Sequence, residues 1–344
     1  MGSNIQLLEL PNDILSTILI HIQNLYNYKY RLINKKLNES IETLFDNYNK
    51  RFTSISINWK NNPKLLIRQL FCLKDENAII FLYNNFTNSK KYINYYAAYY
   101  GNSYILNTLN LNDYKLIAIG AAKAGNLDLV KYAVDKGVTN YEKIALSGAN
   151  SGKTDVVKYA IEKGARNYFG IALKAARKGC LNIIEYIDEY LDKEDYYYIA
   201  ESGAEKGYLN IVKYSVGKGA DNYEDIAIIA ASNGYLDIVK YAVKKGAENY
   251  ESIASNAAYN GYLEIVEYAV ELGAENYEEI AVNAAENGYL DIVKYAIKKG
   301  AKNYNKIAKV AAKHRYFKIV NYAFKMGANN CDVIEKIKQS IIRK

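Results

Sequence analysis

Hydrophobic and polar positions recur along most of the chain with a period of 27 residues. The stretch 222–248, NYEDIAIIAASNGYLDIVKYAVKKGAE, is followed by near-copies at 249–275 and 276–302. Within each copy, apolar residues recur at helical spacing in two short blocks. A unit this short cannot bury a core alone, so successive copies must stack and bury their apolar faces as a continuous layer. The pattern therefore predicts a solenoid.

The first tyrosine of each unit sets the register of eight copies. These residues are Tyr114, Tyr141, Tyr168, Tyr196, Tyr223, Tyr250, Tyr277 and Tyr304. The step is 27 residues, except for 28 between the third and fourth tyrosines. In most other units a Gly-Ala pair follows the second helix. The unit that starts at Tyr168 lacks this pair, which predicts an extended helix or a local bend. In the last unit Arg315 replaces a glycine, and residues 330–344 predict a C-terminal capping helix.

Each unit carries residues that start and stop helices. An Asn or Asp, a preferred N-cap type, precedes every tyrosine, and acidic residues such as Glu224 follow at the positive end of the helix dipole. The predicted N-caps are Asp113, Asn140, Asn167, Asp195, Asn222, Asn249, Asn276 and Asn303. A glycine then ends the first helix, where a positive φ is expected. These glycines are Gly125, Gly152, Gly179, Gly207, Gly234, Gly261 and Gly288.

The run Ala-Ala-x-Asn-Gly-x-Leu-Asp-Ile-Val, with Gly-Ala after the second helix, resembles the ankyrin repeat over residues 113–329. The units are about six residues shorter than the family's and lack its Thr-Pro-Leu-His start. The resemblance implies an all-α solenoid of stacked helix-turn-helix ankyrin-like repeats with short loops and little or no β-hairpin. Tetratricopeptide and HEAT arrays, the next alternatives, have longer periods and lack this Gly-Ala spacing.

The N-terminal residues 1–50 follow a different pattern, and they resemble an F-box. The matching positions are Leu10, Pro11, Ile14, Leu15, Ile18 and Leu19. The resemblance implies a face that docks on the adaptor subunit of cullin-type ubiquitin ligases. A helical cap over the open end of the solenoid explains the same residues equally well. Residues 51–112 predict degenerate helix pairs, with loops at 61–63 and 84–91.

Composition narrows the function classes. Two histidines exclude a multi-histidine metal site, and three separated cysteines (Cys72, Cys180 and Cys331) indicate reduced thiols in the cytosol or nucleus. No apolar run approaches the roughly 20 residues of a membrane span. We find no catalytic motif, so neither an enzyme nor a cofactor is expected. Abundant Tyr, Asn, Ile and Lys, with an F-box-like start, resemble ankyrin-repeat proteins of large DNA viruses, which implies the host cytoplasm.

Positions that vary between units are not constrained by packing of the core, so their side chains are available to bind a partner. Two such positions, four residues apart, form one stripe of the first helix. The stripe residues selected as a partner-binding groove are Lys123, Asn150, Arg177, Glu205, Ile228, Ser232, Ser255, Tyr259, Val282, Glu286 and Lys313. The ankyrin resemblance implies that this stripe contacts protein partners, whereas simple solvent exposure would also permit the variation. We expect a monomeric scaffold that binds an unidentified protein. A more specific hypothesis is that this scaffold is a substrate receptor of a ubiquitin ligase.

A lysine column on the second helix suggests the alternative of a nucleic-acid-binding repeat protein. The column contains Lys131, Lys158, Lys213, Lys240 and Lys294. Glu185 and Glu267 interrupt it, and a nucleic-acid track should not contain carboxylates. We therefore interpret the column as a solvated convex face and do not expect a nucleic-acid partner.

Overall fold

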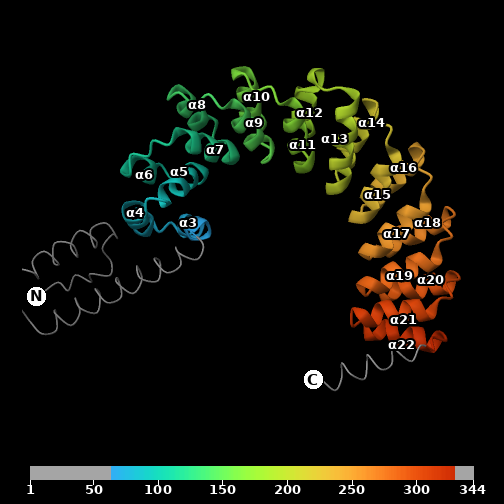
Figure 1. Cartoon of the computed structure of the whole chain (residues 1–344). Helices are drawn as coiled ribbons and strands as arrows, with labels where there is room; N and C mark the ends of the chain where they lie inside the picture. The colour runs from blue at the N-terminus through green and yellow to red at the C-terminus, as the bar shows by residue number, and fades with distance from the viewer. Residues whose placement is uncertain (1–62, 330–344) are drawn as a thin grey trace, which may run out of the picture. The chain divides into compact units, whose positions relative to one another are not determined.

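The structure is a computed structural model, and it describes residues 63–329. The chain divides into two compact parts, which meet in sequence at Ala165 and Arg166 and are described separately below. Figure 1 shows the helices of each part. The predicted F-box-like residues and the predicted capping helix at 330–344 lie outside the described residues. The predicted boundaries at residues 51–112 and 113–329 stay predictions.

The N-terminal part contains four described helix pairs. Their helices are α3 (Pro63–Cys72), α4 (Glu76–Asn85), α5 (Ser89–Tyr99), α6 (Ser103–Thr108), α7 (Tyr114–Ala124), α8 (Leu127–Asp135), α9 (Tyr141–Ala149) and α10 (Thr154–Lys163). The degenerate pairs predicted before residue 113 correspond to α3–α6. The predicted loops at 61–63 and 84–91 were too long. Pro63 already begins α3, as its missing N–H permits at a first helical position, and Ser89 begins α5.

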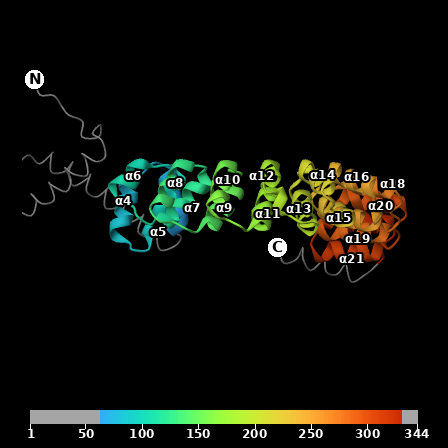
Figure 2. The same ribbon diagram turned by 90° about the horizontal axis from the view of Figure 1, so that it is seen from above.

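The C-terminal part repeats one helix pair with small variations. Its helices are α11 (Tyr168–Lys178), α12 (Leu181–Tyr186), α13 (Lys193–Lys206), α14 (Leu209–Gly217), α15 (Tyr223–Asn233), α16 (Leu236–Lys245), α17 (Tyr250–Asn260), α18 (Leu263–Glu271), α19 (Tyr277–Asn287), α20 (Leu290–Lys299), α21 (Tyr304–Lys313) and α22 (Phe317–Met326). The odd-numbered first helices stack in one row and the even-numbered second helices in another (Figures 1 and 2). Residues 63–329 contain no strand, so the predicted all-α, ankyrin-like solenoid without hairpins is confirmed.

The core is a layer of small and branched side chains. Ala230 and Ala231 of α15 are fully buried, which allows neighbouring first helices to approach closely. Ile238 and Val239 of α16 complete the layer at no more than 1% exposure. Burying one such branched side chain contributes roughly 1.5–3 kcal/mol, and the same positions recur in every unit. Stacking of successive units therefore supplies the stability that a single unit lacks.

Five of the predicted N-caps form the expected bond. The side chains of Asp113, Asn140, Asn167, Asn249 and Asn303 each accept a main-chain N–H three residues onward. Asn222 and Asn276 occupy the predicted N-cap position but do not form the capping hydrogen bond. Their Nδ2 groups donate to Glu201 at 2.8 Å and to Ser255 at 2.7 Å. These partners lie in the preceding unit, so the two asparagines link units instead of capping a helix.

In the unit with the 28-residue step, the structure excludes one of the two predicted alternatives, the extended helix. The second helix α12 is not extended; it ends at Tyr186 and is followed by a short 3-10 helix (Asp188–Tyr190). The next first helix starts early because Asp192 caps it. Asp192 and Asp195 each accept the other's main-chain N–H, which is the reciprocal pattern of a capping box. Asp195, the predicted N-cap, therefore lies inside the first turn of α13.

Asp188 organises this irregular segment. Its carboxylate accepts hydrogen bonds from the Tyr196 and Tyr214 hydroxyls and from the Lys218 ammonium at 2.7 Å. Burial raises the pKa of Asp188, but the three donors outweigh burial, and the net pKa is lowered. The cluster joins the 3-10 helix to α13 and to the end of α14. It replaces the Gly-Ala closure that this unit lacks.

The glycine that ends a first helix has a second role, because a tyrosine of the next unit covers it. Gly234 adopts φ +83°, and a Cβ atom there would lie 2.4 Å from the Tyr262 ring. The same contact pairs Gly179 with Tyr208, Gly207 with Tyr235, Gly261 with Tyr289 and Gly288 with Tyr316. Gly152 was predicted at a helix end, but α9 stops earlier, at Ala149. Arg315 adopts φ +64° where the last unit lacks the glycine.

We expect Gly234→Ala to destabilise the protein more than Gly273→Ala. Both replacements force alanine into positive φ, at a cost of roughly 1–2 kcal/mol. Only Gly234 is covered by a ring, whereas a Cβ atom at Gly273 meets nothing within 4 Å. Displacing Tyr262 adds roughly 1–3 kcal/mol. Urea unfolding followed by circular dichroism measures both variants, and equal losses would contradict the covering role of Tyr262.

Candidate partner-binding face

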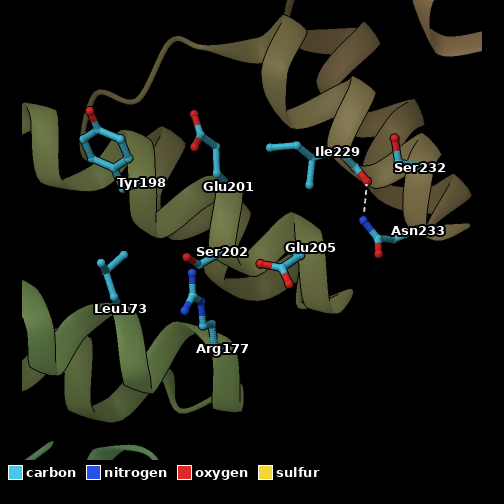
Figure 3. Close-up of a pocket in the computed structure, with 9 residues that line it drawn as sticks. All are labelled: Leu173, Arg177, Tyr198, Glu201, Ser202, Glu205, Ile229, Ser232 and Asn233. Atoms are coloured by element: carbon cyan, nitrogen blue, oxygen red, sulfur yellow. Dashed lines mark hydrogen bonds between the residues drawn. The ribbon is translucent and has the colours of Figure 1, made fainter. Parts of the chain in front are cut away.

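A shallow pocket lies on the exposed side of the first helices of the C-terminal part, which we call the first-helix face. The pocket has a volume of about 370 Å³ and opens between α11, α13 and α15 (Figure 3). The structure brings together three predicted groove residues there, Arg177, Glu205 and Ser232. The pocket is lined by Leu173, Arg177, Tyr198, Glu201, Ser202, Glu205, Ile229, Ser232 and Asn233.

The pocket combines apolar walls with opposite charges. Leu173 and Ile229 provide aliphatic surface, and Tyr198, which also lines the pocket, is 55% exposed. Glu201 and Glu205 lie one turn apart on α13, and both side chains line the pocket (Figure 3). An amphipathic side chain, with an apolar stem and a charged end, fits such a surface.

The two glutamates have opposite electrostatic environments. Burial raises the pKa of Glu201, and the nearby Asp225 raises it further, although the Asn222 amide donates to its carboxylate. The Lys206 ammonium, 2.7 Å from Glu205, lowers the pKa of that carboxyl group against a weaker effect of burial. The pKa values of these two carboxyl groups on one helix are thus shifted in opposite directions.

The other predicted residues of the C-terminal part lie on successive first helices. Ile228 and Val282 are half-buried, Lys313 is exposed, and Tyr259 is 47% exposed. Glu286 is half-buried, with a carboxylate oxygen 3.8 Å from Nε2 of His314 on the next first helix.

Ser255 differs from the rest of the predicted groove. It is only 7% exposed, and its hydroxyl accepts a hydrogen bond from Asn276 of the next unit. Ser255 therefore serves contact between units and offers little surface to a partner.

Two predicted groove residues belong to the N-terminal part. Lys123, on α7, is exposed, and its ammonium lies 5.9 Å from the centroid of the Tyr99 ring. Asn150 is exposed directly after α9.

Three asparagines on the first-helix face are not among the groove residues predicted from the sequence. Asn233, Asn260 and Asn287 end α15, α17 and α19, and all three are half-exposed. Variation between units could not identify them, because these positions hold asparagine in three consecutive units. A polar residue that stays constant at a surface position was the signal that could have identified them.

The lysine column contacts tyrosine rings. The ammonium groups of Lys131, Lys213 and Lys240 lie 5.8, 5.8 and 5.6 Å from the ring centroids of Tyr159, Tyr241 and Tyr268 on the next second helix. At such distances a cation–π attraction contributes about 0.5–1 kcal/mol at exposed sites. These three lysines therefore help to join units.

Other kinds of site receive no support from residues 63–329. Within this range no three His, Cys, Asp or Glu side chains gather as a metal ion would require. None of the helices in the same range combines the length and apolarity needed to cross a membrane.

Comparison with known proteins agrees with the repeat pattern. Residues 200–280 match the family model for ankyrin repeats, which contains 3 copies. No curated protein matches the chain. The match and the repeated helix pairs support an ankyrin-repeat protein. Ankyrin repeats generally form non-enzymatic modules for protein–protein interaction.

We expect Glu201→Gln and Glu205→Gln to change stability in opposite directions at about pH 7. The raised pKa of Glu201 means that its ionised form costs folding free energy, and a glutamine side chain at that position would still accept the Asn222 amide. The lowered pKa of Glu205 means that its carboxylate stabilises the fold above its unfolded-state pKa. Glu201→Gln should raise the urea midpoint, and Glu205→Gln should lower it.

Both differences should shrink as the pH falls to about 4. Protonation removes the penalty at Glu201 as well as the stabilisation at Glu205. Urea midpoints at the two pH values test this expectation, and shifts of the same sign at neutral pH would contradict the assigned environments.

Proposed function

We propose that the protein is a non-enzymatic scaffold that binds another protein on the first-helix face. The pocket formed by α11, α13 and α15 carries this proposal, because it combines apolar walls, charged groups and an exposed ring at one place. Protein interfaces favour such combinations, with aromatic residues and arginine as frequent anchors. Tyr198 and Arg177 are the anchors available in the pocket, and Tyr259 provides a further exposed ring on α17.

A photo-crosslinking amino acid at Tyr259 should capture a partner, and one at Tyr132 should not. The two tyrosines are 47% and 48% exposed, so accessibility is matched. Tyr259 lies on the first-helix face, whereas Tyr132 lies on the second helix α8. The measurement is covalent capture from expressing cells, followed by loss of the adduct when Arg177→Ala and Tyr198→Ala are added. Equal capture at both positions would contradict a partner site on the first-helix face.

We further propose that residues 1–50 recruit the adaptor subunit of a cullin-type ubiquitin ligase. In this arrangement the repeats at 113–329 hold a target, residues 51–112 connect the two regions, and the protein acts as a monomeric receptor in the cytoplasm, of the host if the source is a virus. Support comes from the F-box-like spacing of Leu10, Pro11 and Ile14. The helical cap remains the alternative for the same residues.

Deletion of residues 1–50 should abolish recovery of the ligase adaptor and leave crosslinking at Tyr259 intact. A second variant, Leu15→Asp with Leu19→Asp, should act like the deletion because charge opposes burial of the proposed docking face. Adaptor recovery is measured by quantitative co-purification with the full chain as the reference. Failure to recover the adaptor with the full chain would eliminate the receptor proposal and favour the cap.

A further inference from the structure

Three consecutive first helices present the same side-chain acceptor at the same place. Nδ2 of Asn233, Asn260 and Asn287 donates to the main-chain carbonyl four residues earlier, at 2.8, 3.0 and 3.4 Å. A carbonyl oxygen can only accept, so each amide must turn its nitrogen to the helix. The three Oδ1 atoms are thereby directed away from that carbonyl, and no residue in the described part of the chain donates to them.

The spacing of this row fits an extended polypeptide. Packed helices lie about 8–10 Å apart, and the three asparagines occupy equivalent positions on neighbouring helices. A polyproline II segment has three residues per turn and rises about 3.1 Å per residue, so N–H groups on one side recur about every 9 Å. Its main chain has no internal hydrogen bonds. An α-helix has already used its N–H groups, and a β-strand repeats about every 6–7 Å.

The charge of these helices indicates which side chains an extended polypeptide would need in order to bind them. Helices α15, α17 and α19 contain six acidic residues and no lysine or arginine, although the whole chain has a net charge of +8. The acidic residues are Glu224, Asp225, Glu251, Glu278, Glu279 and Glu286. Glu224 and Glu278 accept main-chain N–H groups of the following unit. Five of the six acidic residues lie in the first turns of these helices, at the end away from the asparagines, and Glu286 precedes Asn287 in sequence. The charge of the three helices as a whole favours a basic segment.

Carboxylates lie next to both ends of the asparagine row. Glu286 directly precedes Asn287, and Asn233 lines the pocket that contains Glu201 and Glu205. Within the pocket, Leu173 and Ile229 can cover the aliphatic stem of a lysine or arginine while Glu201 meets its charge. Lys206 and Arg177 offset part of the acidic charge, mainly at Glu205.

We propose that α15, α17 and α19 bind an extended, lysine- or arginine-rich segment of a partner protein. Asn233, Asn260 and Asn287 accept successive main-chain N–H groups of this segment, and the α11–α13–α15 pocket takes one basic side chain. The inference rests on the proposed function and specifies the partner that the first-helix face selects.

Fluorescence anisotropy with the full-length protein tests the main-chain bonds. The probe is a fluorescein-labelled (Lys-Pro-Ser)4 peptide, which is basic and favours polyproline II. The first control carries methyl groups on all lysine and serine main-chain nitrogens, and the second is (Glu-Pro-Ser)4. We expect the N-methylated peptide to bind at least about tenfold more weakly, as loss of three hydrogen bonds implies, and the acidic peptide not to bind. Equal binding of the methylated and unmethylated probes would overturn the proposal.

A triple variant tests the acceptors on the protein. Asn233→Ala with Asn260→Ala and Asn287→Ala should weaken binding of the lysine probe at least about tenfold. Alanine favours helix, so the variant should fold, and circular dichroism checks this. The matched control is Asn182→Ala with Asn210→Ala and Asn321→Ala on second helices, which should change binding less than about twofold. Equal binding by both triple variants would show that charge alone attracts the peptide, and would overturn the proposal.

The outcomes separate this inference from the proposed function. If the lysine probe fails to bind while crosslinking at Tyr259 still captures a protein, the extended basic partner is wrong and the scaffold function stands. If both fail, the scaffold function is wrong as well.

Discussion

The stacking of each unit on its neighbour is the constraint on which the rest of the structure depends. Fully buried alanines such as Ala230 need a close neighbouring helix, and the left-handed Gly234 lies beneath a ring of the following unit. These contacts fix the core positions and the glycine in unit after unit. They leave the exposed side of the first helices free to vary, so the interface that stabilises the protein also defines where recognition can occur.

Local signals predicted the helices well, and competition between units caused the errors. First helices begin at the anchoring tyrosine wherever the preceding Asn or Asp is the strongest local cap. In α13 an upstream Asp192, paired with Asp195, shifts the start, and periodicity alone could not reveal it. Asn222 does not form the capping hydrogen bond, and its amide instead donates to the Glu201 carboxylate of the preceding unit. The pocket likewise depends on side chains from three helices, so spacing along one helix predicted only part of its lining.

The first helices α15, α17 and α19 differ in charge from the second helices α16 and α20, which lie beside them. Lysines of the second helices, such as Lys213 and Lys240, direct their charge at tyrosine rings of adjacent units. The first helices α15, α17 and α19 carry only acidic charges. A modest net positive charge for the chain therefore hides an acidic surface. Counting charges over the whole sequence therefore misses the acidic charge of these three helices.

The contacts between units have a consequence for how such a chain can change its length. Gly234 meets Tyr262, and Gly261 meets Tyr289, through the same pair of residue types. Recombination that removes or duplicates one 27-residue unit would join two surfaces that already match, so the array can gain or lose units without redesigning an interface. The segment around Asp188 is different, because its carboxylate requires Tyr214 and Lys218 of the next unit. That junction is not interchangeable, which anchors the register of the array at one place.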